Sequence, residues 1–111
     1  MIKDTINDLQ RKYPYINSIH LNRNLIGNEI SDFSLTLTLS NNQVIDENDK
    51  VTIKFWNIRE LKLGEIDNLF RVYISISDIS NRQMDGIRYR VSEEENNLFS
   101  FLCKDIEILS E

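Results

Sequence analysis

The residues best suited to nucleophilic chemistry are the only cysteine and the only histidine of the chain, Cys103 and His20. A thiolate activated by an imidazole is a common catalytic pair, so these two side chains would have to meet in the folded protein. Cys103 follows Phe101 and Leu102, however, and an apolar setting is typical of a buried, inert thiol. His20 stands between two apolar residues and has no second histidine to work with. We therefore expect no catalytic residue in this chain.

Metal and cofactor sites find equally little support. One cysteine and one histidine are too few for a zinc site. The run Asp46-Glu47-Asn48-Asp49 resembles part of a calcium loop, but it lacks the glycine at the bend and the distal glutamate. Glycine-rich phosphate loops, GxSxG turns and HExxH helices are missing too. We expect a protein that is not an enzyme and that binds neither a metal nor a cofactor.

The charge balance narrows the choice of partners. Eighteen acidic and thirteen basic residues give a net charge of -5, which disfavours nucleic acid and anionic membranes as partners. Residues 1–30 hold four basic and three acidic residues, whereas residues 31–111 hold nine basic and fifteen acidic residues. The acidic character therefore belongs to the second stretch, and a basic protein remains a suitable partner.

Length and composition indicate one folded unit. A chain of 111 residues is enough for a single domain, 1–111, with one hydrophobic core. The first fifteen residues are too polar for a signal peptide, and the apolar runs are too short for a membrane helix. A single cysteine excludes an internal disulfide and fits a reducing compartment, so we expect a cytoplasmic protein.

The elements that must position any site are mostly strands. Apolar residues recur at helical spacing over 2–13 and stop at Pro14, which predicts one amphipathic helix. Alternating apolar and polar residues predict six or seven strands, at 15–21, 33–40, 51–56, 58–63, 69–80, 87–91 and 98–109. The connections are too short for parallel crossovers, so the fold class is α+β, a mainly antiparallel twisted or curved sheet with the helix packed on it.

Three details refine this prediction. The apolar parity shifts near Asn57 to Glu60, which indicates a β-bulge or a bend, and the last strand is expected to bend at Lys104-Asp105. Residues 69–80 are long enough for a central strand, and residues 22–31 look like a loop or an irregular hairpin. The predicted core includes Leu35, Leu37, Ile53, Val72, Ile74, Ile76 and Phe101.

Surface residues are the remaining candidates for function. Acidic side chains gather in predicted turns and at strand ends, at Asp46, Glu47, Asp49, Asp78, Asp85, Glu93, Glu94 and Glu95. They could create a negative field for a basic partner, or they could simply keep the turns soluble, and Arg88 and Arg90 could pair with some of them across the strands. Trp56, Arg71 and Tyr73 fall on the polar faces of their strands, where they could form a binding hot spot or cover the second face of the sheet.

About half of the chain also resembles a known class of proteins. From Val51 to Leu109, the runs VTIKFWNIRELKL and FRVYISISDISNRQMDGIRYRVSEEENNLFSFLCKDIEIL look like small acidic immunity proteins of bacterial contact-dependent growth inhibition and related polymorphic toxin systems. This resemblance implies a cognate toxin domain as partner, often a nuclease with a basic substrate groove, whose active-site cleft the protein blocks. Within that class we expect a ribonuclease. The alternative is a non-catalytic adaptor or small-ligand-binding β-sheet module with aromatic side chains lining a pocket.

Overall fold

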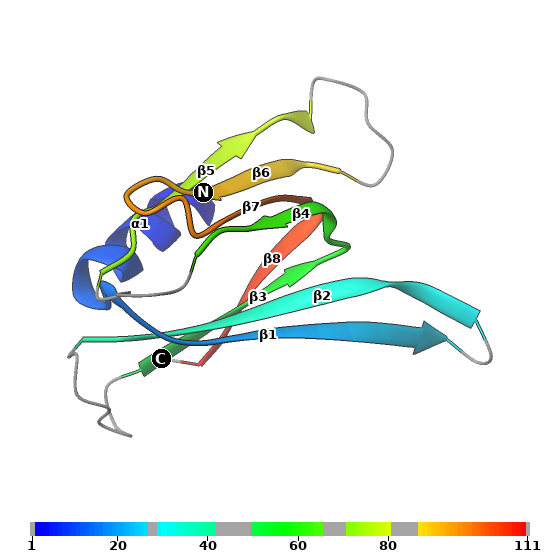
Figure 1. Ribbon diagram of the computed structural model, residues 1–111, viewed down its shortest axis with the longest axis horizontal. Coiled ribbons are helices and arrows are strands. Elements are labelled where there is room, and N and C mark those ends of the chain that lie inside the picture. Colours follow the sequence, from blue (N-terminus) through cyan, green and yellow to red (C-terminus); the bar gives the residue numbers. More distant parts are fainter. Residues whose placement is uncertain (1, 27–28, 42–49, 66–70, 81–86, 111) are drawn as a thin grey trace.

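The computed structural model describes residues 2–26, 29–41, 50–65, 71–80 and 87–110, which hold one helix and eight strands in two antiparallel sheets (Figure 1). The helix is α1 (Ile2–Lys12). The first sheet contains, in spatial order, β1 (Tyr15–Ile26), β2 (Glu29–Ser40), β3 (Lys50–Trp56) and β8 (Asp105–Ser110). The second contains β4 (Arg59–Leu63), β7 (Phe99–Cys103), β6 (Tyr89–Glu93) and β5 (Ile74–Asp78).

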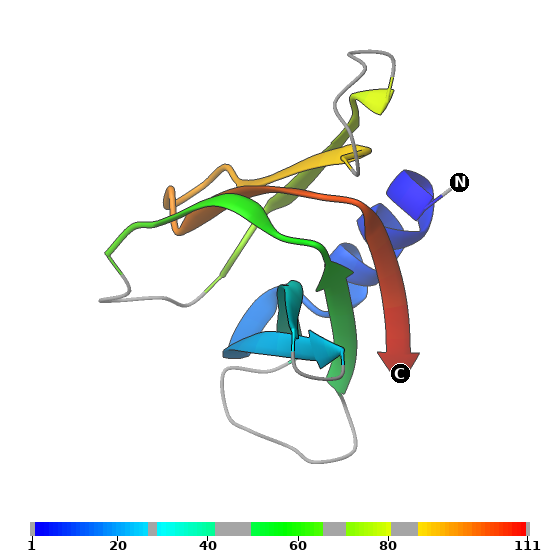
Figure 2. The same ribbon diagram turned by 90° about the vertical axis from the view of Figure 1, so that its right-hand side faces the viewer.

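Two bent segments join the sheets. The predicted α+β class with antiparallel strands is confirmed, but the strands form two sheets. The chain passes from β3 to β4 at Asn57 and from β7 to β8 at Lys104, as Figure 2 shows. Asn57 has a φ of 58°, in the left-handed region that asparagine tolerates better than most residues. The two corners are joined, because the backbone N–H of Lys104 donates to the carbonyl of Trp56 at 2.9 Å. The predicted bends at 57–60 and 104–105 are therefore the points where strands change sheets.

The first hairpin is longer than the sequence predicted. β1 runs for twelve residues instead of ending at Leu21, and it pairs with β2 as far as Ile26 opposite Glu29. Residues 22–26 pair with residues 29–34, so the ladder formed by the strongly alternating part of β2 continues into the Asn-rich segment and overrides its weak strand propensity. Figure 1 shows this hairpin extending beyond the second sheet.

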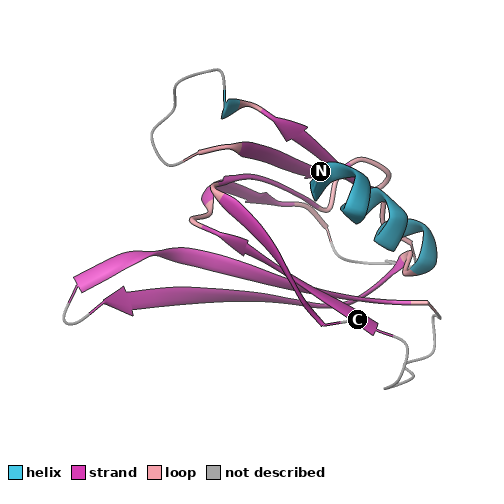
Figure 3. Ribbon diagram, turned by 180° about the vertical axis from the view of Figure 1, so that it is seen from behind, coloured by secondary structure: helices cyan, strands magenta, loops and turns pink. Residues whose placement is uncertain are grey.

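The position of β5 corrects one prediction. It has five residues and forms an edge of the second sheet, so residues 69–80 are not a central strand. α1 lies beside β5 (Figure 3). The side-chain oxygen of Gln10 in this helix accepts the N–H of Ile74 at 3.1 Å. The carbonyl of Pro14 accepts the N–H of Val72 at 2.9 Å. These bonds protect an edge that would otherwise be free to pair with another chain.

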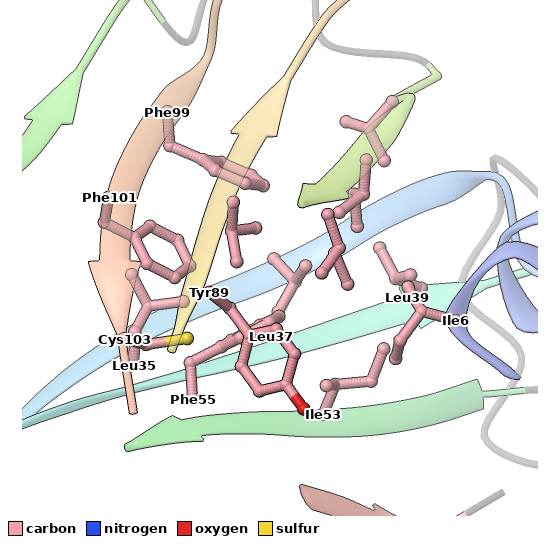
Figure 4. Close-up of a cluster of buried hydrophobic side chains, with 14 of the residues drawn as sticks. Ile6, Leu35, Leu37, Leu39, Ile53, Phe55, Tyr89, Phe99, Phe101 and Cys103 are labelled. Atoms are coloured by element: carbon pink, nitrogen blue, oxygen red, sulfur yellow. The ribbon is translucent and has the colours of Figure 1, made fainter. Parts of the chain in front are cut away.

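The core fills the space between the two sheets (Figure 4). Phe55 of the first sheet meets Phe101 of the second edge to face, with ring centroids 5.1 Å apart. Ile6 and Leu9 of α1 pack into the same cluster. Every residue of the predicted core is buried: Leu35, Leu37, Ile53, Val72, Ile74, Ile76 and Phe101.

Candidate partner-binding surface

The two residues considered for nucleophilic chemistry point in different directions. Cys103 has no exposed surface and lies in the core. Burial is the main reason that the pKa of its thiol is raised to about 12, and the nearby negative charge of Asp105 adds to the effect. His20 is exposed and pairs with Thr36, on the face of the first sheet opposite to the core. They therefore form no dyad. Within the part of the chain that the structure describes, no three His, Cys, Asp or Glu side chains group as metal ligands would.

Glu93 organises the turn between β6 and β7. Its carboxylate is 2% exposed and accepts hydrogen bonds from four backbone N–H groups. Oε2 receives those of Tyr73 and Glu95, both at 2.9 Å. Oε1 receives those of Asn96 at 2.7 Å and Leu98 at 3.2 Å. One side chain thus holds its own turn and the start of the neighbouring strand β5 together.

The protonation of Glu93 follows from this geometry. Burial by itself raises the pKa of the carboxyl group, because a charge is poorly solvated there. The backbone donors, first among them Tyr73 and Glu95, favour the charged form and more than offset burial, so the pKa lies below its ordinary value. Glu93 is therefore an ionised structural group at neutral pH.

Four exposed side chains surround this buried carboxylate, two from the segment before β5 and two from the turn, and we call them the turn surface: Arg71, Tyr73, Glu94 and Glu95. Tyr73 is 57% exposed. The N–H of Glu94 donates to the carbonyl of Tyr73 at 2.8 Å, and the Asn96 amide donates to the carbonyl of Arg71 at 2.8 Å. The backbone that carries these groups is thus fixed by hydrogen bonds, which lowers the entropy lost on binding.

The tight approach of β4 to this turn requires a glycine. Gly64 donates its N–H to the carbonyl of Leu98 at 2.7 Å. A β-carbon at Gly64 would collide with the carbonyl oxygen of Asn97. Any larger residue would therefore push the end of β4 away from the turn.

Trp56 belongs to a different part of the molecule. It lies at the end of β3, where its ring is covered by the Lys54 ammonium at 3.8 Å and its N–H donates to Glu107 at 3.1 Å. Trp56 precedes β4, whereas Tyr73 precedes β5 at the opposite edge of the second sheet. The structure therefore brings Arg71 and Tyr73 together with the acidic turn but leaves Trp56 apart from them.

The other predicted acidic residues divide into two groups. Asp78 accepts two hydrogen bonds from Ser80, which are the main reason that its pKa is lowered, and it lies 3.6 Å from Arg88. This confirms the predicted pairing of Arg88, whereas Arg90 has no ion-pair partner among the described residues. The remaining predicted sites lie outside the described residues: Asp46, Glu47, Asp49 and Asp85.

The interpretation of Glu93 as an exposed turn charge is wrong. It continues the buried set of β6, in which Tyr89, Val91 and Glu93 alternate with outward residues. That alternation is visible in the sequence and was the signal available, but the adjacent glutamates made the position resemble a solvated acidic turn.

Two packed sheets with Tyr73, Glu94 and Glu95 exposed beside one turn offer the kind of surface by which a protein can contact another macromolecule. In a comparison with protein families, the family described as "Immunity protein PIM8" matches residues 1–109, and the chain belongs to this family. It is thus an immunity protein of a toxin system, a toxin-neutralising protein. No curated protein and no solved structure matches the chain. The described residues contain no helix of the length and apolarity needed to cross a membrane.

Proposed function

We propose that this immunity protein inhibits its toxin by placing the turn surface against a basic active-site cleft. The toxin would be a nuclease, and within that class a ribonuclease, delivered by contact-dependent growth inhibition or a related system. Inhibition would take place in the cytoplasm and involve no catalysis by the immunity protein. The observation that carries the proposal is the Glu93-centred turn, which presents Tyr73, Glu94 and Glu95 on a fixed backbone.

Charge and shape would have separate roles in this interface. Glu94 and Glu95 lie in the acidic stretch of the chain and would attract a positively charged cleft, which mainly speeds association. Tyr73 would supply apolar contact with little loss of side-chain freedom, which mainly slows dissociation. Substrate would then be excluded from the cleft because the turn occupies it.

The alternative of a small-ligand module has less support. Its binding pocket would lie between the strands and be lined by aromatic rings. The rings between the sheets, Phe55 and Phe101, pack directly on each other. Trp56 and Tyr73 lie outside that core cluster.

The test is a charge reversal that leaves Glu93 intact. Glu94→Lys combined with Glu95→Lys should slow association with the toxin domain encoded beside the gene about tenfold at low salt and flatten the salt dependence. The control, Asp4→Lys with Asp8→Lys, changes the net charge equally but on exposed positions of α1. Equal rates for both double variants would contradict the proposal.

Two further variants locate the contact. Tyr73→Ala should raise the Kd at least about tenfold, chiefly through faster dissociation. Reversing Asp46, Glu47 and Asp49 to lysine tests the other predicted acidic turn in the same assay. If only this triple variant slowed association, the acidic face would lie there and the turn surface would be excluded.

A further inference from the structure

A trough runs along the outer face of the second sheet, over β7. Ser100 and Leu102 of β7 form its floor, Glu60 and Lys62 of β4 form one wall, and Arg90 of β6 forms the other. Neighbouring strands lie about 4.8 Å apart, so the two walls are about 10 Å from each other. A trough of this width, with a serine and a buried leucine along its floor, is wide enough for an extended polypeptide segment.

A β-bulge in β4 directs cations to this face. Arg59 and Lys62 are three positions apart, yet both pair with residues of β7 that are only two positions apart. The extra residue lies between them, where Glu60 has a φ of 53°. In a regular strand, residues three apart point to opposite faces, so the bulge brings Arg59 and Lys62 to the same outer face. Leu61 packs against the core instead.

Three cations of this face form no ion pair with a described carboxylate. Among the described residues, Arg59, Lys62 and Arg90 have no carboxylate partner within ion-pair distance. By contrast, Arg88 on the same sheet is paired with Asp78. The Glu60 carboxylate lies beside them, so three cations face one carboxylate there, and this part of a chain with a net charge of -5 has a positive local balance.

We propose that the trough binds an acidic, extended segment of the toxin. Guanidinium and ammonium groups on both walls match the carboxylates of aspartate and glutamate, and an Arg90 fork can bind one carboxylate through two hydrogen bonds. The Ser100 hydroxyl, on the floor between them, can donate another. The inference rests on the proposed function, because the occupant belongs to the same toxin.

The trough and the turn surface are continuous. Lys62 and Ser100 line both the trough and a second hollow, which reaches Glu94 at the turn. The Ser92 hydroxyl donates to the Glu94 carboxylate at 2.6 Å and holds it at this junction. The toxin surface would therefore carry a basic region for the turn surface and, next to it, an acidic segment for the trough.

The arrangement is tested by whether added negative charge in the trough weakens or strengthens binding to the toxin domain. If the toxin were basic over the whole interface, making the immunity protein more acidic would strengthen binding or leave it unchanged. We expect instead that Lys62→Glu combined with Arg90→Glu raises the Kd for the toxin domain at least about tenfold, because like charges would meet. Lys3→Glu with Lys104→Glu, two exposed positions outside the trough, adds the same negative charge and should not weaken binding.

Each outcome decides the proposal. Equal Kd values for the trough variant and its control would overturn it, as would tighter binding of the trough variant. A short single-stranded RNA titrated into the free protein tests a different occupant, and RNA binding that is lost in the trough variant would also overturn it. Loss of affinity in the trough variant but no effect of Glu94→Lys with Glu95→Lys would support the trough and contradict the turn surface.

Discussion

The backbone N–H of Tyr73 donates to the carboxylate of Glu93 at 2.9 Å, across twenty positions of sequence. This bond joins the residue before β5 to the end of β6, and the Glu94 N–H returns a bond to the Tyr73 carbonyl at 2.8 Å. The backbone of Tyr73, the aromatic residue of the turn surface, is therefore fixed from beneath by a buried charge. Stability and the proposed recognition of the toxin would then depend on the same side chain.

Substitution of Glu93 should destabilise the protein strongly. Glu93→Gln keeps the shape, but it replaces an acceptor of two backbone donors with an N–H₂ group, and leaving buried donors unsatisfied costs about 2 to 4 kcal/mol here. Urea unfolding of the variant measures this loss. Glu95→Gln, an exposed neighbour, is the control and should change the free energy of unfolding by less than about 0.5 kcal/mol. Equal stability of the two variants would remove the structural role of the carboxylate.

The pH dependence of stability should carry the signature of Glu93. Its pKa in the folded protein is below the value of 4.5 that applies to an unperturbed group, so the unfolded chain binds its proton first as the pH falls. The contribution is complete above about pH 4.5 and is lost as the pH falls through the folded pKa. The free energies of unfolding of the native protein and of Glu93→Gln, measured from neutral to acidic pH, should therefore approach each other as the pH falls. If the difference between the two free energies stayed constant with pH, the acid sensitivity would belong to other carboxylates.

Protection against the toxin should not require His20 or Cys103. His20 is exposed on the outer face of the first sheet, and the raised pKa of Cys103 leaves it protonated at neutral pH. His20→Ala and Cys103→Ala should each retain protection in cells that express the toxin domain. Circular dichroism melts show whether the variant is folded at the growth temperature. A folded variant that no longer protects would restore a chemical role for that residue.

Much of the fold could be predicted because its signals are local. The alternation of Leu35, Leu37 and Leu39 with polar residues identifies β2, and Pro14 marks the end of the helix. The division into two sheets could not be predicted in the same way. A parity shift near Asn57 is equally compatible with a bulge in one sheet and with a strand that enters another.

The candidate site was less accessible to sequence reasoning. Tyr73 meets Glu94, and Arg71 meets Asn96, only because β5 pairs with β6 in one register, with Ile74 opposite Glu93. That pairing is a tertiary property, and so is the separation of Trp56 from the turn surface. The trough depends on a single bulge residue, Glu60, whose effect on side-chain direction appears only when β4 is paired with β7.

The edge position of β5 leads to a last prediction, because this strand is buried without being central. Ile74 is 1% exposed and points into the core, while its N–H reaches the side chain of Gln10 at 3.1 Å. Ile74→Ala should lower the free energy of unfolding by about 2 to 5 kcal/mol through lost apolar burial and the cavity that remains. Gln10→Ala should cost less, about 1 to 3 kcal/mol, because it leaves one backbone donor unsatisfied and keeps the core filled. Urea unfolding of both variants shows which of them loses more free energy of unfolding. A loss below about 0.5 kcal/mol for Ile74→Ala would contradict the packing of β5 against the core.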